Sequence, residues 1–344
     1  MSFRVPAEYV VPLRWSNDSD LVEFTEYLRF LRDWVDVTVV DGSGPDLFAA
    51  HATAWSGLVR QLPVGAWPGR NRKVAGVVTG VFAARHEYVI IADDDVRYRA
   101  DHLAQVVFRL AGADLVRPQN VFHPLPWHAR WDTARSLLNR AFGSDYPGTL
   151  GIRRSTFRRA GGYDGDVLFE NLQLIRTITA AGGRTDRADD LFVTRRPPTT
   201  RKFLEQRIRQ AYDDFAQPPR LIWEASWLPV LISTAIRRPT VLPILVLGPV
   251  LIAEIGRRRH HGRAAFPPGS ALWAPLWTLE RAITIWLAIG QRLVGGTKYH
   301  GQRLPTAATR PPLPHRAADL GPAAAHSRPT TNQEPPVLLN GARS

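Results

Sequence analysis

The stretch Tyr88-Val89-Ile90-Ile91-Ala92-Asp93-Asp94-Asp95 joins an apolar run to a cluster of acids. Its first five residues are apolar and β-branched in the middle, which predicts a strand buried on both faces of a sheet. Carboxylates in succession repel one another unless a positive charge lies among them. A divalent metal ion would supply that charge, because Mg²⁺ commonly bridges carboxylates to substrate phosphates. The alternative is that the acids cap a helix over residues 96–112.

Strand and helix patterns alternate on the N-terminal side of this stretch. From Leu21 to Leu31, apolar residues repeat at intervals of three and four, which is typical of an amphipathic helix. The other expected elements are strands at 9–13 and 35–40 and helices at 46–58 and 74–84. Such alternation over about 110 residues predicts an α/β, Rossmann-like fold with a mainly parallel, doubly wound sheet. Ligands bind at the carboxyl ends of strands in such sheets, which is where the acidic triplet lies.

Two further polar elements lie close to strand or helix ends. Asp41 follows the strand 35–40 and precedes two glycines, so its carboxylate would accept hydrogen bonds from a base or a ribose, or simply form a turn. Asn71 and Lys73 precede the apolar helix 74–84. A cation near the start of a helix suits a phosphate, although a single lysine is more often a solvated surface residue.

The next two candidates lie between residues 160 and 210. A glycine pair precedes Asp164, and Glu170 begins a helical pattern, so a carboxylate here would act as a general base or as a helix cap. Gln206 and Arg209 are three residues apart and would share one helix face. An arginine on that face would pair with a diphosphate, or it would belong to a solvated basic surface.

The charge of the chain is strongly positive and uneven. The 344 residues carry a net charge of +13 and no cysteine, which excludes disulfides, cysteine-bound metals and thiol nucleophiles. Between residues 237 and 304, ten basic residues stand against two acidic ones. Long apolar runs lie around these charges, at 221–236, 239–255 and 271–289. This interleaving favours an anionic membrane surface over nucleic acid, with a soluble helical appendage as the alternative.

The order and spacing of these motifs resemble the family 2 glycosyltransferases of the GT-A type, including the membrane-bound ceramide-glucosyltransferase-like branch. The resemblance runs from Tyr9 to Leu304. It implies a metal site at Asp93 and Asp95, which form the D-x-D motif of the family. It also implies that the nucleotide-sugar is bound by residues spread over the first 210 positions: Asp41, Asn71, Lys73, Asp93, Asp94, Gln206 and Arg209.

Two positions depart from the family pattern. Asn171 stands where the family has the aspartate usually assigned as the catalytic base. Glu170 is therefore the favoured base, with Asp164 or Asp166 as alternatives, unless the protein is catalytically impaired. Gln210 replaces a tryptophan that helps processive synthases hold their growing chain, so a single transfer is expected.

The resemblance implies an inverting, metal-dependent glycosyltransferase that uses Mg²⁺ or Mn²⁺. A UDP- or GDP-sugar would be the donor, and a lipid or cell-envelope glycan would be the acceptor. We expect a catalytic domain over residues 1–220 on the cytoplasmic side of the membrane, membrane-associated helices over 221–304, and a disordered Pro/Ala-rich tail over 305–344. The alternative is a non-catalytic binding partner of an envelope-glycan enzyme, and nucleic acid is not expected as a partner.

Overall fold

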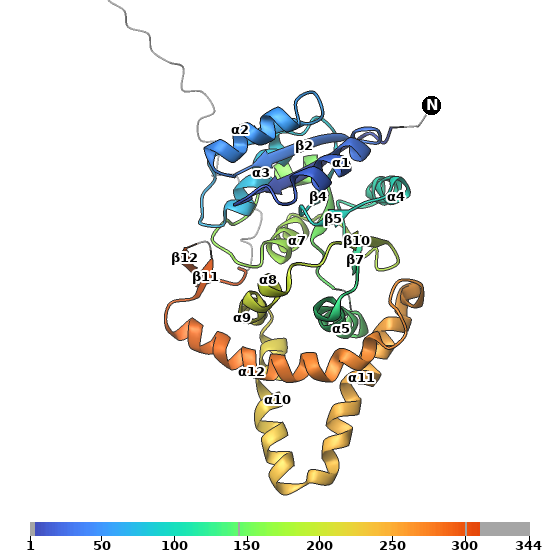
Figure 1. Cartoon of the computed structure of the whole chain (residues 1–344), viewed down its shortest axis with the longest axis vertical. Helices are drawn as coiled ribbons and strands as arrows, with labels where there is room; N and C mark the ends of the chain where they lie inside the picture. Colours follow the sequence, from blue (N-terminus) through green and yellow to red (C-terminus); the bar gives the residue numbers. More distant parts are fainter. Residues whose placement is uncertain (1–3, 144, 300, 310–344) are drawn as a thin grey trace, which may run out of the picture.

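The computed structural model describes residues 4–143, 145–299 and 301–309, which form an α/β body with helices below it (Figure 1). A seven-stranded sheet has the order β3-β2-β1-β4-β8-β6-β9. Its strands are β1 (Ala7–Leu13), β2 (Asp36–Asp41), β3 (Arg60–Pro63), β4 (Tyr88–Ala92), β6 (Leu115–Val116), β8 (Thr149–Arg153) and β9 (Thr185–Asp186). Only β8 runs antiparallel to its neighbours among these described strands. The expected α/β fold with a mainly parallel sheet is therefore confirmed.

Helices cover both faces of this sheet, which explains why its central strands β1 and β4 consist mostly of apolar residues. Two of them, with side chains from β1 and β2, form one buried cluster: α1 (Leu21–Arg32) and α4 (Ala100–Leu110). Three others form a second cluster with β1, β4 and β8: α3 (Arg72–Ala83), α6 (Arg154–Arg159) and α7 (Glu170–Ala180). The helix α2 (Pro45–Ala54) follows β2.

A close approach of α3 to the sheet sets where its N-terminus lies. A Cβ atom at Gly80 would come within 2.3 Å of Val10 Cγ1 and 3.0 Å of Val40 Cγ2. Glycine at this position therefore allows the helix to pack directly on β1 and β2. The first turn of α3, with Lys73, is thereby placed at the carboxyl end of the sheet.

A second, three-stranded sheet corrects one expectation. It consists of β5 (Val96–Arg97), β10 (Phe192–Arg195) and β7 (Gln119–Phe122). Val96 and Arg97 pair with the antiparallel strand β10, so the helix expected from residue 96 begins only at Ala100. The acidic triplet therefore precedes a strand, and it does not cap a helix.

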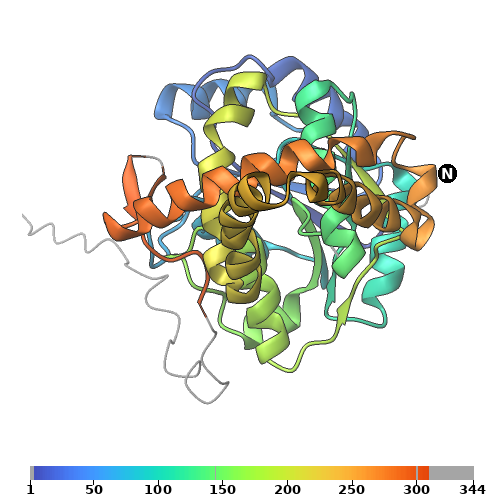
Figure 2. The same ribbon diagram turned by 90° about the horizontal axis from the view of Figure 1, so that it is seen from below.

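The C-terminal half below the main sheet is mostly helical, as expected from its apolar runs. The elements are α5 (Trp127–Phe142), α8 (Thr200–Glu205), α9 (Arg207–Tyr212), η1 (Asp213–Ala216), α10 (Pro218–Arg237), η2 (Pro239–Val241), α11 (Leu242–Arg258), η3 (Arg259–Ala264), η4 (Ser270–Trp273) and α12 (Ala274–Leu293). A hairpin of α10 and α11 projects from the body, and α12 crosses between the hairpin and the body (Figure 1, and from below in Figure 2). The chain then forms the hairpin of β11 (Thr297–Tyr299) and β12 (Gln302–Leu304).

Large apolar side chains are exposed on the hairpin and on one face of α12. They include Ile232 and Ile236 on α10, Ile244, Val246, Leu247 and Leu251 on α11, and Leu276, Leu279, Ile283, Trp286 and Leu287 on α12. Among the described residues, one helical segment, Pro239–Ala264, is long and apolar enough to cross a membrane. A buried ion pair between Arg281 and Asp214, 3.0 Å long, fastens the opposite face of α12 to the body.

The described residues include 305–309, the first five positions of the expected tail. The backbone NH groups of Leu168 and Phe169 donate to the carbonyls of Thr306 and Ala307 over 3.0 and 2.7 Å. Residues 305–309 therefore pack beside the start of α7 and are not a disordered segment. The remainder of the expected tail, residues 310–344, lies outside the described residues.

Candidate active site

A cleft of about 1140 Å³ opens at the carboxyl end of the main sheet. It is bounded by the ends of β1 and β4, the start of α3, and the segment from the end of β10 through α9. Its acidic lining residues are Asp20, Asp93, Asp94, Asp95, Asp132 and Glu205. Its more numerous basic lining residues are Arg14, Arg70, Arg72, Lys73, Arg97, Arg135, Arg195, Arg196, Lys202, Arg207 and Arg209. The excess of cations suits an anionic ligand.

Lys73 joins the acidic triplet to the start of α7. Its Nζ lies 2.6 Å from Asp93 Oδ1 and 2.6 Å from Glu170 Oε1. Burial alone would lower the pKa of Lys73, but the two carboxylates outweigh it and hold that pKa well above its usual range. Burial likewise opposes ionisation of Asp93, yet the charges of Lys73 and Arg195 lower its pKa. Lys73 and Asp93 are therefore both charged at neutral pH.

Arg195 neutralises the other side of the triplet. Its Nε donates to both oxygens of Asp95, over 3.0 and 2.9 Å, and its Nη2 lies 3.3 Å from Asp93 Oδ2. Arg195 ends β10 and pairs in register with Val96 of β5, the residue that follows the triplet. Sequence reasoning missed Arg195, because this pairing joins positions about a hundred residues apart.

Asp94 points to a different partner. Its Oδ2 accepts a hydrogen bond from the indole NH of Trp15 over 2.6 Å, and its backbone carbonyl accepts one from Arg97 over 2.6 Å. Trp15 follows the end of β1 and was not predicted as a site residue. The side chains of Lys73, Arg195 and Trp15 thus bind the three acids of the triplet.

The triplet has the oxygen donors that a divalent metal ion prefers. In the described part of the chain, however, no three Asp, Glu or His side chains converge on one point. The carboxylate oxygens of Asp95, and Oδ2 of Asp93, accept hydrogen bonds from Arg195. The residues therefore fit a metal ion on the condition that Arg195 releases Asp95.

Asn71 and Asp41, both expected to contact the nucleotide, are buried and fully hydrogen-bonded. Asn71 caps α3: its Oδ1 accepts from the backbone NH of Lys73 over 3.0 Å, and its Nδ2 donates to Val167 O. Asp41 binds His51 Nδ1 over 2.6 Å and accepts from the side-chain amide of Gln61 over 2.9 Å. Neither residue lines the cleft, although their chain neighbours Gly42 and Arg72 do, and a direct contact of either with a nucleotide stays a prediction.

Asp164 and Asp166, the alternative bases, belong to a separate group at the rim. Asp166 forms an ion pair of 2.9 Å with Arg70, and both side chains are about half exposed. Asp164 accepts hydrogen bonds from the backbone NH of Asp166 and from the hydroxyl of Thr309. Glu170, in contrast, is tied directly to the triplet through Lys73.

The Gln206–Arg209 pair lies on the wall opposite the triplet. The single helix expected there is broken, because α8 ends at Glu205 and α9 begins at Arg207. Both residues nevertheless line the cleft. The guanidinium of Arg209 lies 5.6 Å from the ring centre of Tyr299, another cleft residue, in a cation–π contact.

Asp213 is a titratable residue close to the site that the sequence analysis overlooked. Burial raises its pKa to about 7, although Arg209 opposes the shift, and the charge of Glu170 adds to it. Its Oδ1 is buried and accepts no hydrogen bond from the described residues. The neighbouring Asn171, in contrast, is fully structural here, donating to Pro147 O over 3.0 Å.

Comparison with known proteins relates the chain to glycosyltransferases. Residues 48–120 match a family model described as Glycosyl transferase family 21. The matched segment contains Asn71, Lys73 and the triplet. No curated protein matches the chain at a significant level. The family match bears out the expected class of enzyme, a glycosyltransferase.

Several solved glycosyltransferases are distantly similar to the chain. One is a mannosyltransferase from Pyrobaculum calidifontis in complex with GDP-Man and Mn²⁺, with 19% identity and a TM-score of 0.47 over 83% of this chain and 88% of that one. Another is glucosyl-3-phosphoglycerate synthase from Mycobacterium tuberculosis in complex with Mn²⁺, UDP and glucosyl-3-phosphoglycerate. That enzyme has 16% identity and a TM-score of 0.38 over 57% of this chain and 74% of that one.

Proposed function

We propose that the protein transfers one sugar from a UDP- or GDP-sugar to an acceptor hydroxyl, with inversion at the anomeric carbon. The observation that carries the proposal is the Asp93–Lys73–Glu170 bridge, with both contacts at 2.6 Å. Lys73 and Asp93 line the cleft, and Glu170 contacts Lys73, which supports Glu170 as a candidate base beside the candidate donor site. Within the described part of the chain, Arg14, Arg72 and Lys202 line the same cleft without forming an ion pair. These cations are suited to a diphosphate.

Glu170 is the proposed general base. Its Oε1 accepts a hydrogen bond from Lys73, which orients the carboxylate. Glu170 would take the proton of the acceptor hydroxyl as the acceptor oxygen bonds to the anomeric carbon. The bond from that carbon to the diphosphate oxygen breaks on the opposite face, so the configuration inverts. The cations of the cleft would stabilise the charge that develops on the leaving diphosphate.

A divalent ion, Mn²⁺ or Mg²⁺, would be held by Asp93 and Asp95. When bound, it would neutralise part of the diphosphate charge. The transfer would be single: Gln210, at the position of the tryptophan expected in processive enzymes, is hydrogen-bonded to Arg207 over 2.6 Å. Nothing in its position offers an aromatic surface for a growing glycan.

We further propose that the hairpin of α10 and α11 inserts into a membrane and that α12 lies at the membrane surface. The apolar side chains exposed on these helices support this arrangement, since monomeric soluble proteins rarely expose apolar patches of this extent. A lipid or an envelope glycan carried on a lipid would then reach the cleft from the membrane. The catalytic body would lie on the cytoplasmic side.

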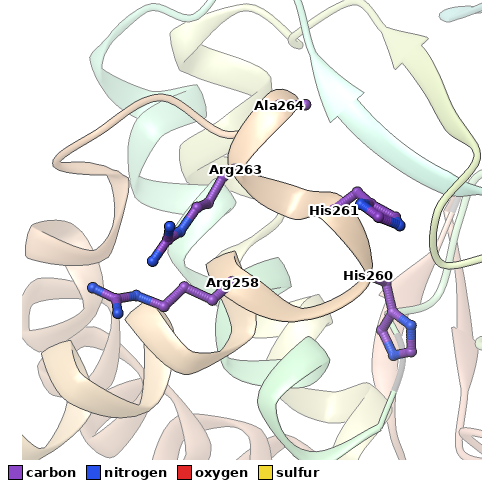
Figure 3. A pocket seen from close by; sticks show the side chains of 5 residues that line it. All are labelled: Arg258, His260, His261, Arg263 and Ala264. Atoms are coloured by element: carbon purple, nitrogen blue, oxygen red, sulfur yellow. The ribbon is translucent and has the colours of Figure 1, made fainter.

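The base of α11 carries a cluster of basic residues suited to anionic lipid headgroups. Arg258, His260, His261 and Arg263 line one shallow pocket, and the side chains of Arg258 and Arg263 extend to the same side of it (Figure 3). Arg258 shares Glu254 with Arg257, whereas Arg263 forms no ion pair with a described residue. This positive end of the apolar helix would face lipid phosphates.

The experiment that tests the function is a donor screen. The detergent-purified protein is incubated with UDP- and GDP-sugars, lipid acceptors and Mn²⁺ or Mg²⁺, and release of nucleoside diphosphate is measured. We expect release with one donor and loss of activity in Asp93→Asn, with Glu26→Gln on the exposed face of α1 as the unaffected control. Donor binding without turnover for any acceptor would instead favour a non-catalytic binding partner.

A further inference from the structure

Arg195 occupies the position from which a metal ion would bind the triplet. It donates to both oxygens of Asp95 and to Oδ2 of Asp93, so one guanidinium holds the two carboxylates of the D-x-D motif. The backbone fixes this geometry. Arg195 is in register with Val96, and the NH of Arg196 donates to the carbonyl of Asp95 over 2.7 Å.

Gly148 leaves room for the guanidinium. A Cβ atom at this position would lie 3.0 Å from Arg195 Nη1, 3.1 Å from its Cζ and 2.9 Å from Asp93 Oδ2. Gly148 is also held in place, since its NH donates to Asn120 Oδ1 and its carbonyl accepts from the NH of Asp93. The absence of a side chain at Gly148 therefore allows Arg195 to lie flat against the chain beside the triplet.

The same carboxylate oxygens cannot serve Arg195 and a metal ion together. A metal ion lies about 2.0–2.2 Å from its oxygen ligands and needs the lone pairs that now accept N–H groups. Two cations on the same pair of carboxylates would also repel each other. Lys73 adds a further positive charge on the other oxygen of Asp93.

We propose that Arg195 is an internal cation that competes with the divalent metal ion for Asp95. This inference rests on the metal dependence included in the proposed function. Binding of the metal ion replaces the hydrogen bonds from Arg195 to Asp95, and the released guanidinium is then free to pair with the diphosphate of the donor. Metal ion and nucleoside diphosphate therefore bind cooperatively, because the diphosphate gives Arg195 a new partner.

The test measures the affinity of the protein for Mn²⁺ without substrate. Electron paramagnetic resonance reports the concentration of free Mn²⁺ during the titration. We expect wild-type protein to bind Mn²⁺ weakly and Arg195→Gln to bind it about 10-fold or more tightly, with Arg195→Lys in between. Adding UDP or GDP should tighten Mn²⁺ binding to wild type by more than it does for Arg195→Gln. Thermal melting of each variant checks that the fold is retained.

Arg196→Gln is the matched control. It removes the same charge from the adjacent position of the cleft, but the Arg196 side chain pairs with Glu23 and, among the described residues, forms no ion pair with the triplet. We expect its Mn²⁺ affinity to stay within about twofold of wild type. Equal Mn²⁺ affinities of wild type and Arg195→Gln, or equal gains in Arg195→Gln and Arg196→Gln, would overturn the proposal. Failure of every variant to bind Mn²⁺ would overturn it too, while nucleotide release in the presence of EDTA would show that the transferase function stands.

Discussion

Lys73 links Asp93, after β4, to Glu170 at the start of α7. It is mostly buried between Asp93 and Glu170, which face each other across its ammonium group. Without it, two carboxylates would share one partly desolvated site. We therefore expect Lys73→Gln to lower the free energy of unfolding by about 1–3 kcal/mol and to weaken nucleotide binding. Chemical denaturation and calorimetric titration with UDP and GDP measure the two effects.

Lys202 is the control for that change. It lines the same cleft but forms no ion pair with a described residue. We expect Lys202→Gln to leave the free energy of unfolding within about 0.5 kcal/mol of wild type. A loss of stability in Lys202→Gln as large as in Lys73→Gln would contradict the bridging role of Lys73.

Asp213 makes the stability of the protein depend on pH. Its pKa is raised to about 7 in the folded protein, so folding favours the protonated carboxyl. The unfolded chain ionises this group near pH 4, and Asp213 therefore destabilises the fold increasingly as pH rises from about 4 to 7. We expect Asp213→Asn to be more stable than wild type by roughly 1–3 kcal/mol at pH 8 and equal to it near pH 3.5. Denaturation curves at both pH values would show this, and a gain of the same size at both would refute the assignment.

Close packing of α3 on the sheet predicts that a side chain at Gly80 destabilises the protein. Alanine favours helix over glycine by about 1 kcal/mol, but a Cβ at Gly80 would collide with Val10 and Val40. We expect Gly80→Ala to lower the free energy of unfolding by about 1–3 kcal/mol. Gly290 on α12, where a Cβ would meet no atom within 4 Å, is the matched control. Gly290→Ala should be neutral or stabilising, and a destabilised Gly290→Ala beside a neutral Gly80→Ala would contradict this packing.

The elements that the sequence predicted are those whose patterns are local. Strands β1, β2 and β4 and the helix α3 each contain a local run of apolar residues, so their neighbours were not needed to recognise them. The start of the helix expected from residue 96 was wrong, because Val96 and Arg97 pair with a distant strand and the helix begins only at Ala100. Within the site, Lys73, Asp93 and Glu170, which were separate candidates in the sequence, lie in direct contact. Arg195 and Trp15 were missed, since neither residue is distinguished from the other arginines and tryptophans by sequence alone.

In the proposed function, the apolar hairpin attaches the whole molecule to a membrane. Ile232 on α10 and Leu247 on α11 are each more than half exposed. Placing a charge on both would make insertion unfavourable by roughly 2–3 kcal/mol per residue. We expect the double variant Ile232→Glu/Leu247→Glu to lose binding to lipid vesicles in a flotation assay. Phe108→Glu on α4, equally apolar and 81% exposed but on the body, should float as wild type does.

The cluster of basic residues at the C-terminal end of α11 gives a separate prediction about lipid composition. We expect Arg258→Gln/Arg263→Gln to bind neutral vesicles as wild type does and to lose about 1 kcal/mol per arginine on anionic vesicles. Flotation with phosphatidylcholine alone and with added phosphatidylglycerol separates the two contributions. An unchanged preference for anionic vesicles would show that this cluster does not face the lipid.

The central claim is that Glu170, which contacts Lys73 at the wall of the cleft, is the base for a donor bound in that cleft, and Glu170→Gln tests it most directly. The variant keeps the shape of the side chain but cannot take a proton. We expect Glu170→Gln to bind the nucleotide-sugar within a few-fold of wild type and to lose turnover by about 10²–10⁴-fold in the nucleoside diphosphate release assay. Wild-type turnover in Glu170→Gln, or loss of activity only in Asp164→Asn or Asp166→Asn, would contradict the assignment.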